Sequence, residues 1–319
     1  QQAARKNLEL NAIIPDSLDF LPSTSSPTEI FDTVWIKIPK SLALLEQQLL
    51  ALRECINPNS LILLAGMIKH MPSRVWSMVE SIIGPIETAA GRKKAKLIRA
   101  FFNPDQTPTT AATMVQWTLP ASEFSLINHA NVFSRERLDT GARLLLDCLP
   151  QTSGPGNIID LGCGNGVLGM MAAHSNPESH VHFIDESWMA IESARTNAQQ
   201  LGKREGQLQF SVGDGLRCSV PVPVQGSLLP CVDAQPAAIA ADSVDLILCN
   251  PPFHQQQAVS ETAARFMFSD AASALVEHGE LWVVGNRHLG YHKTLKRWFK
   301  TVNLMSSNRK FVVLRAQKL

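Results

Sequence analysis

From Asn157 onward, short apolar segments alternate with longer segments whose apolar residues recur at helical spacing. Helices are expected at 167–174 and from Ser187, a residue type that caps helix N-termini, to about residue 201. The alternation predicts an α/β domain with a mostly parallel sheet. The expected strands are 157–161, 180–185, 208–212, 244–249 and 280–285.

The last two apolar segments, 302–306 and 310–316, flank Ser307-Asn308, which predicts an antiparallel hairpin at the end of the sheet. Between the third and fourth expected strands, residues 218–243 contain four prolines. Proline cannot donate a backbone hydrogen bond, so we expect a surface excursion without a packed element there.

The first third of the chain repeats the last third. Four matches in the same order predict two tandem copies of one Rossmann-like fold, dividing at 1–122 and 123–319. The matches pair Ala4–Asn7 with Ala194–Asn197, FDTVWIKIPK from Phe31 with VDLILCNPPF from Val244, SLILLAG from Ser60 with ELWVVGN from Glu280, and GRKKAKLIRA from Gly91 with NRKFVVLRA from Asn308.

The first copy is expected to be incomplete. Because Ala4 matches Ala194, the counterparts of 157–185 would precede residue 1. Half a sheet would leave an apolar edge and face uncovered. The repeat therefore predicts that the natural protein extends about one βαβ unit further at its N-terminus.

Composition supports two soluble globular units, since the chain has 319 residues, 45% of them hydrophobic and 18% charged. No segment approaches the roughly 18 apolar residues of a membrane span, and no signal peptide is present, which predicts a cytoplasmic protein without a membrane partner. The cysteines are too scattered for a zinc site or a disulfide framework, so we expect no metal. They are Cys55, Cys148, Cys163, Cys218, Cys231 and Cys249.

A net charge of +1 conceals two basic clusters. Residues 281–319 contain nine Lys or Arg and no acid, and GRKKAKLIR at 91–99 contains five and no acid. Such clusters suit a polyanion, but a solvated charged face fits them equally well.

A glycine-rich turn, IIDLGCGNG at 158–166, follows the first strand of the second copy. It places Gly162, Gly164 and Gly166 between a strand and a helix, where bare backbone can approach a ligand and the helix offers free N–H groups. This pattern is typical of a nucleotide-like cofactor, and by itself it fits a nicotinamide dinucleotide as well as any other.

Acids end three successive strands, at Asp160, Asp185 and Asp214. In such folds an acid at the position of Asp185 accepts hydrogen bonds from ribose hydroxyls. Helix capping or a turn would explain each acid alone, but three at one rim predict a cofactor site.

The fourth strand argues against a dinucleotide, because it ends in Asn250-Pro251-Pro252-Phe253. These residues offer one amide oxygen, backbone carbonyls and one aromatic ring. Two acceptors would orient the nitrogen lone pair of a flat conjugated amine toward an electrophile, and Phe253 would stack on its ring. A tight Pro-Pro turn is the simpler structural interpretation of the same residues.

At these residues the chain resembles class I S-adenosylmethionine-dependent methyltransferases. The resemblance implies that Asp160 and the three glycines serve the cofactor, with the glycines at its methionine end. It also implies that Asp185 binds the ribose, Asp214 the adenine amine and Asn250 the target amine. Phe133 and Gly141 lie in the segment that family members place over the methionine, although the nearby Asp139 fits a helix cap nearly as well.

Longer runs are similar to bacterial ribosomal RNA guanine-N2 methyltransferases, which have one degenerate and one active domain. The resemblance implies methylation of a guanine in 23S rRNA, with a first copy that binds RNA or serves as a scaffold. Lys37 replaces Asn250 there, and a cation cannot accept a hydrogen bond. NHANVFSR, VDESWMA, CNPPFHQQ, NRKFVVLRA and PKSLALLEQQL are most similar to the large-subunit branch.

Three alternatives remain at this point. They are a small-subunit (16S) rRNA guanine-N2 methyltransferase, a protein glutamine-N5 methyltransferase, and a non-catalytic RNA-binding factor in ribosome assembly. Arg287 and His288 could meet a phosphate or face solvent. Cys249 could be a nucleophile, but a small side chain at the end of a buried strand explains it more simply.

Overall fold

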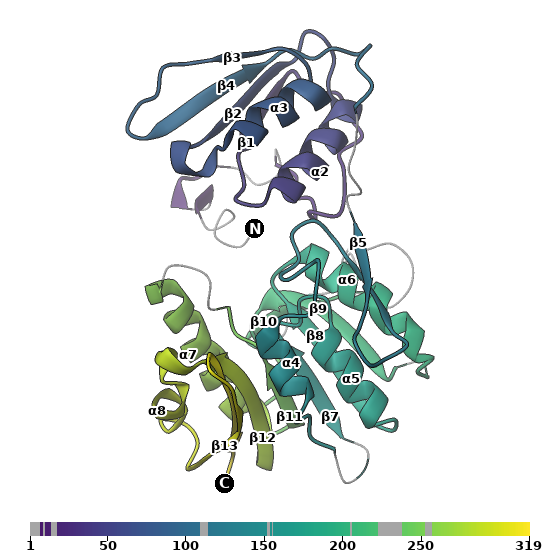
Figure 1. Ribbon diagram of the computed structural model, residues 1–319, viewed down its shortest axis with the longest axis vertical. Helices are drawn as coiled ribbons and strands as arrows, with labels where there is room; N and C mark the ends of the chain where they lie inside the picture. The colour runs from purple at the N-terminus through teal and green to yellow at the C-terminus, as the bar shows by residue number, and fades with distance from the viewer. Residues whose placement is uncertain are drawn as a thin grey trace. The chain divides into compact units, whose positions relative to one another are not determined.

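The computed structural model describes residues 7–8, 10–13, 18–108, 114–151, 154, 156–204, 206–222, 238–252 and 257–319. The chain forms two compact units, unit 1 (Gln1–Thr109) and unit 2 (Thr110–Leu319) (Figure 1). This division lies ahead of the expected boundary at 122/123.

Unit 2 is built on an eight-stranded sheet in the order β10-β9-β8-β7-β11-β12-β14-β13. The strands from β9 to β12 are mutually parallel, and β14 and β13 close the sheet as an antiparallel hairpin. The predicted α/β fold is confirmed. The bounds are β7 (Asn157–Leu161), β8 (His180–Asp185), β9 (Leu208–Asp214), β10 (Cys218–Val222), β11 (Val244–Cys249), β12 (Leu275–Asn286), β13 (Thr301–Ser307) and β14 (Phe311–Gln317).

The prediction that 218–243 lacks a packed element is wrong at its start, where β10 pairs antiparallel with β9. Pro221 belongs to this strand, opposite Ser211. β10 is at the edge of the sheet, and an edge strand tolerates proline because one of its sides needs no ladder donor. Residues 223–237 lie outside the described part of the chain.

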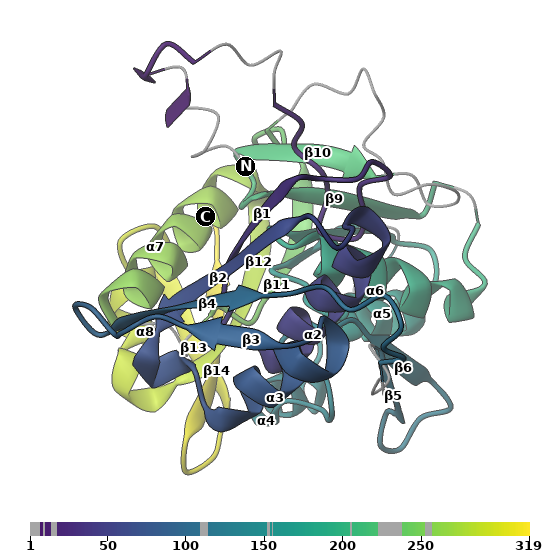
Figure 2. The same ribbon diagram turned by 90° about the horizontal axis from the view of Figure 1, so that it is seen from above.

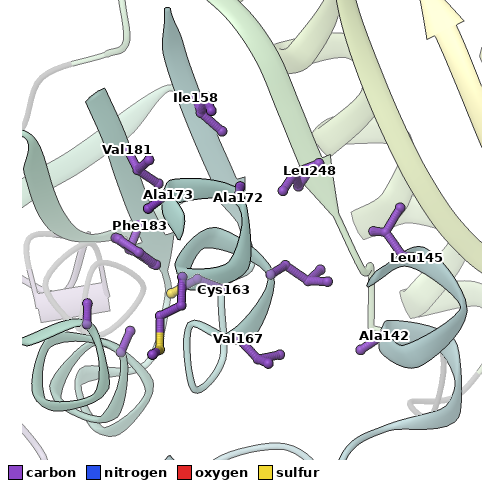
Figure 3. Packing of buried hydrophobic residues seen from close by; sticks show 14 of the residues in the cluster. Ala142, Leu145, Ile158, Cys163, Val167, Ala172, Ala173, Val181, Phe183 and Leu248 are labelled. Atoms are coloured by element: carbon purple, nitrogen blue, oxygen red, sulfur yellow. The ribbon is translucent and has the colours of Figure 1, made fainter. Parts of the chain in front are cut away.

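Helices cover both faces of this sheet (Figures 1 and 2). Side chains alternate along β11, so Leu248 packs in the cluster with α4, α5 and α6, whereas Ile247 packs in the cluster with α7 and α8. Figure 3 shows the first cluster, with Ala142 and Leu145 of α4 beside Leu248. The helices are α4 (Thr140–Leu146), α5 (Val167–Ser175), α6 (Trp188–Ala198), α7 (Gln257–Ala274) and α8 (Tyr291–Leu295), with 3-10 turns η4 (Gln199–Leu201) and η5 (Arg287–Leu289).

A separate two-stranded hairpin, β5 (Val115–Thr118) and β6 (Ser125–Asn128), precedes α4. The sequence pattern did not predict it. It leads directly into the NHANVFSR run that resembles the family.

Unit 1 has a four-stranded sheet in the order β1-β2-β4-β3, with apolar side chains packed against α2 and α3. The elements are β1 (Thr33–Lys37), α2 (Leu42–Leu52), η2 (Arg53–Cys55), β2 (Leu61–Met67), η3 (Ile68–His70), α3 (Ser73–Ile82), β3 (Ile86–Thr88) and β4 (Ala95–Ala100).

The two units share a strand topology, as the internal repeat predicted. In each, a parallel pair (β1-β2, β11-β12) continues into two antiparallel strands (β4-β3, β14-β13).

One predicted match is displaced by one residue. Ile62 lies opposite Ala100 and Leu281 lies opposite Ala316, so the strand register equates Ile62 with Leu281. The sequence match had equated Ile62 with Trp282, whose side chain faces the other side of the sheet, since a one-residue slip exchanges faces. The register keeps Lys37 as the counterpart of Asn250 and makes Met67 the counterpart of Asn286.

The helices formed by the described residues are each too short or too polar to span a bilayer. The same residues contain no cluster of three or more His, Cys, Asp or Glu side chains that could hold a metal ion.

Candidate active site

The predicted glycine turn joins β7 to α5. Gly162, Gly164 and Gly166 have φ angles of 73°, 55° and 81°, in the left-handed region that favours glycine. A Cβ on Gly166 would lie 2.8 Å from Ala194 Cβ in α6, and one on Gly162 would lie 3.2 Å from Met267 Cε. A Cβ on Gly164 would meet nothing within 4 Å. Gly164 therefore borders open space in which a ligand can lie.

Asp160 is buried in β7. Its Oδ2 accepts the N–H of Gly169 at 2.8 Å and so caps the first turn of α5. Burial raises the pKa of this carboxyl to about 7, and the nearby Asp185 acts in the same direction, against the lowering effect of the Gly169 bond. Asp160 thus fixes the helix that follows the glycine turn.

Asp185 ends β8, beside the glycine turn. Its Oδ2 accepts the N–H of Gly164 at 3.0 Å, and its Oδ1 accepts the N–H of Ser187 at 2.8 Å. Burial raises the pKa of this carboxyl to about 6, although both backbone bonds lower it. Each carboxylate oxygen has more than one lone pair, so Asp185 holds the turn and keeps acceptor capacity for ribose hydroxyls.

Asp214 ends β9 and its side chain is exposed at the rim. The loop that follows is held to α7, because Asp270 Oδ2 accepts the N–H of Leu216 at 3.4 Å and Arg217 forms an ion pair with the same carboxylate. Asp185 and Asp214 thus end β8 and β9, and Asp160 is the last residue but one of the neighbouring parallel strand β7.

Asn250 directly follows β11, which pairs with β7. Its Nδ2 donates to Asp139 Oδ2 at 3.4 Å, and the same oxygen accepts the N–H of Ala142 at 2.9 Å, so Asp139 caps α4. A carboxylate can only accept, which fixes the amide with Nδ2 toward Asp139. Asn250 Oδ1 is buried and has no hydrogen-bond partner among the described residues. Such an orphaned acceptor costs about 1–3 kcal/mol, which a donor on a ligand would offset.

The other predicted site residues occupy different environments. Pro251 is buried, Pro252 is exposed, and Phe253 lies outside the described residues. Gly141 is buried in the first turn of α4, where a Cβ would lie 2.9 Å from the capping carboxylate oxygen. Phe133, in the segment before α4, is 49% exposed.

Two buried thiols, Cys163 and Cys249, adjoin these residues in sequence. Burial raises the pKa of both well above the usual thiol value, and the carboxyl of Asp160 acts in the same direction. Because the thiolate is the nucleophilic form, neither residue fits the role of a covalent nucleophile.

The basic cluster at 281–319 is partly neutralised. Arg315 pairs with Glu280, and Lys318 Nζ lies 2.7 Å from Asp242 Oδ1. Both acids lie outside the basic segment, and tertiary pairing brings them to it.

The basic cluster at 91–99 is divided by strand geometry. Arg92, Lys93 and Lys94 form an exposed turn before β4. Lys96 instead lies with its Nζ 4.8 Å from the centroid of the Trp76 ring. The turn therefore offers three exposed cations to a polyanion.

Comparison with known proteins identifies the family. The RLMG N-terminal domain model matches residues 1–106, and the methyltransferase small domain model matches 123–218 and 232–315. A Pseudomonas fluorescens protein named ribosomal RNA large subunit methyltransferase G is 42% identical over 317 residues, covering 99% of this chain and 79% of the relative. Proteins of the same name from Ectopseudomonas mendocina and Pseudomonas aeruginosa are each 43% identical, with the same coverage.

The chain belongs to the ribosomal RNA large subunit methyltransferase G family. The family that the sequence motifs indicated is therefore confirmed. Among solved structures, the T. thermophilus 16S rRNA N2 G1207 methyltransferase in complex with AdoMet and guanosine has a TM-score of 0.75 at 19% identity, covering 94% of this chain and 76% of that one. That likeness shows that the fold is shared.

The chain also contains a buried amide network that the sequence pattern did not predict. Asn165 Nδ2 donates to Asn128 Oδ1 at 2.9 Å, and Asn197 Nδ2 donates to the Asn165 carbonyl at 3.0 Å. Asn197 Oδ1 accepts the N–H of Ile127 at 2.7 Å. The network fastens β6 to the glycine turn and α6. Asparagine usually lies at surfaces, so residue type alone does not predict this network. The available sequence signals were the NHANVFSR run, which contains Asn128, and the internal repeat, which matches Asn197 with Asn7.

Proposed function

We propose that this chain transfers a methyl group from S-adenosylmethionine to the exocyclic N2 of a guanine in large-subunit ribosomal RNA, in the cytoplasm. The observation that carries the proposal is the orphaned Oδ1 of Asn250 at the edge of the sheet that holds the glycine turn and Asp185. The names of the relatives support an rRNA of the large subunit as substrate.

The residues fit the cofactor. Gly164 borders open space on the ligand side of the turn, and Asp185 offers remaining lone pairs to ribose hydroxyls. Asp214 is the proposed partner of the adenine amine, and Gly162 and Gly166 shape the turn. When bound, S-adenosylmethionine supplies an electrophilic methyl group.

Asn250 prepares the target nitrogen for attack. The lone pair of guanine N2 is delocalised into the ring, so the amine is a weak nucleophile. Asn250 Oδ1 accepts one of its hydrogens and a backbone carbonyl of the Asn250-Pro251 turn accepts the other, which directs the lone pair toward the electrophile. Asp139 keeps the amide in the required orientation by accepting from its Nδ2.

No strong base is needed, because the methylated nitrogen is cationic and loses a proton to a carbonyl oxygen or water. Phe253 is the proposed stacking partner of the base. Guanine N2 is buried in a paired helix, so the base must be unpaired or flipped to reach Asn250.

We further propose that unit 1 binds and orients the RNA without catalysing transfer. Lys37 occupies the position of Asn250 and is exposed, and the turn of Arg92, Lys93 and Lys94 offers cations to phosphates.

A partition assay tests the proposal. The chain is incubated with radiolabelled S-adenosylmethionine, protein-free 23S rRNA, protein-free 16S rRNA and a ribosomal protein fraction, and the label is followed into each. We expect label in 23S rRNA. Label confined to 16S rRNA or to protein would contradict the assigned substrate, and failure to bind the cofactor would contradict an enzymatic role altogether.

A further inference from the structure

A second buried amide lies near Asn250. Asn286, the last residue of β12, is 7% exposed, and its Oδ1 has no hydrogen-bond partner among the described residues. It occupies the N-cap position of η5 but makes no capping hydrogen bond with its side chain. Helix capping therefore does not explain why an amide is buried here at a cost of about 1–3 kcal/mol.

The two amides lie on the same face of the sheet. Leu248 in β11 and Val284 in β12 both belong to the cluster packed against α4 and α5. Because side chains alternate along strands, Asn250 and Asn286, each two residues further on, are on that face as well. β11 and β12 are parallel, with Cys249 opposite Val283, so both amides are at the same carboxyl edge.

Contacts around the N-terminus of α4 connect the two amides. Asn286 is the register partner of Phe311 in β14. A Cβ on Gly141 would lie 3.4 Å from the Phe311 ring and 2.9 Å from Asp139 Oδ2, the oxygen that accepts from Asn250. Both amide oxygens are closed to solvent, so side chains around this helix end must shift when a base enters.

The order of the strands places the two amides side by side, beyond the glycine turn. Across the edge, β8 carries Asp185, β7 leads into the glycine turn, β11 leads into Asn250 and β12 ends at Asn286. A guanine with N2 at Asn250 has N1–H on one side of the amine and N3 on the other. The orientation with N1–H on the side of β12 gives the buried acceptor of Asn286 a donor, whereas the opposite orientation sets that acceptor against the bare N3.

We propose that Asn286 Oδ1 accepts the N1–H of the target guanine. This inference rests on the proposed function and assigns a second residue to base recognition. Adenine has a bare N1 and no amine at C2, so it would leave both buried acceptors without a donor, which discriminates strongly. The counterpart in unit 1 is Met67, which is 40% exposed and offers no amide.

Substrate analogues separate this role from a merely structural one. The substrates are two synthetic RNA fragments spanning the modified position, one with guanosine there and one with 2-aminopurine riboside, which keeps the 2-amino group and lacks N1–H. Transfer rates are measured for the wild type, for Asn286→Ala, and for Asn286→Met, which fills the volume with the residue of unit 1.

We expect each variant to lower transfer to guanosine about tenfold, the value of roughly one hydrogen bond, and to leave transfer to 2-aminopurine within about twofold. Asn250→Ala serves as the control, because it should lower transfer to both fragments. Equal losses on both fragments in the Asn286 variants, or no loss on guanosine, would overturn the inference while leaving the proposed function intact. If the wild type transferred no methyl to guanosine N2, the proposed function would fail first and this inference with it.

Discussion

Units 1 and 2 arrange four strands in the same topology, but they differ at the edge where chemistry would occur. β11 leads into Asn250, which Asp139 holds and whose Oδ1 is buried, whereas β1 ends at the exposed Lys37. The shared topology places Asn250 and Lys37 at equivalent strand ends. The chemical type and the burial of each side chain then decide whether it can accept a hydrogen bond from an amine and polarise it.

The faces that carry these residues also differ. In unit 2, α4 and α5 cover the face of Leu248 and Val284. In unit 1, the equivalent face carries Trp35, which is 71% exposed, and Met67. A hydrogen-bond acceptor is strongest in a dry site. Among the described residues of unit 1, the end of β1 therefore has neither the amide nor the buried surroundings that would make an amide effective.

The largest expected effect comes from truncating the two equivalent strand ends. Asn250→Ala should lower the transfer rate about 100-fold to 1000-fold, because it removes a preorganised polar contact to the reacting amine. The Kd for S-adenosylmethionine, measured by calorimetry, should stay within a few-fold. Lys37→Ala is the matched control and should leave kcat within about twofold. A comparable loss in both variants would mean that the units do not divide the work as proposed.

Asp185 gives the next largest effect, since it belongs to the proposed cofactor site of unit 2. Asp185→Ala should weaken binding of S-adenosylmethionine about tenfold to a hundredfold through lost hydrogen bonds to a charged group. Wild-type affinity should fall as the pH drops through about 6, where this carboxyl takes up a proton. Calorimetric titrations between pH 5 and 8 measure both effects. Glu186→Ala is the control. The assignment would be refuted if Asp185→Ala left the affinity for S-adenosylmethionine unchanged, or if Glu186→Ala lowered it as much.

Buried carboxyls offer a third distinction, because Asp160 and Asp270 are buried in unit 2 and no carboxyl is buried in the described part of unit 1. The folded-state pKa of Asp160 is raised from 3.8 to about 7, so its contribution to stability is fully present below about pH 4 and lost as the pH rises through 7.

In the wild type, the free energy of unfolding of unit 2 should fall between pH 5.5 and 8, and Asp160 should account for about 2 kcal/mol of that fall. Asp160→Asn should abolish this part, because the amide does not titrate, while its oxygen still accepts the N–H of Gly169. Hydrogen exchange at several pH values, which reads the two units separately, is the measurement. A smaller pH dependence will remain, because the pKa of Asp185 is also raised, to about 6. A pH dependence as large in the variant as in the wild type would show that Asp160 is not its source.

The smallest expected effect concerns RNA binding by unit 1. Replacing Arg92, Lys93 and Lys94 with alanine should raise KM for rRNA several-fold and flatten the salt dependence of binding, with kcat unchanged. Steady-state kinetics at several salt concentrations measure this. Lys318→Ala is the control, because its ammonium is already paired with Asp242. An unchanged KM in the triple variant would argue that unit 1 is only a scaffold.

Much of unit 2 follows from its pattern, because strands such as 157–161 and 180–185 have the predicted bounds and Ser187 caps α6 as expected. The hairpin before α4 and the strand around Pro221 were missed, since short edge elements depend on tertiary pairing more than on their own residues. The register slip at Ile62 arose because similar apolar residues on both faces of β2 leave the sequence match ambiguous.

At the site, the sequence pattern predicted which residues lie at the ends of the strands. It did not predict the hydrogen bonds between them. The sequence placed Asn250 and Asp185 at one edge, and the roles of these residues remain predictions. It did not show that Asp139 fixes the amide of Asn250, or that Asn165 and Asn197 hold the glycine turn. Those contacts join residues far apart in the chain, and nothing local distinguishes a bridging asparagine from a surface one.

The most direct test of the central claim is the identity of the methylated nucleoside. Protein-free 23S rRNA is incubated with S-adenosylmethionine and either the wild type or Asn250→Ala, then digested to nucleosides and analysed by mass spectrometry with fragmentation. We predict N2-methylguanosine at one position with the wild type and none with Asn250→Ala. A different methylated nucleoside, or N2-methylguanosine formed at the normal rate by Asn250→Ala, would contradict the account.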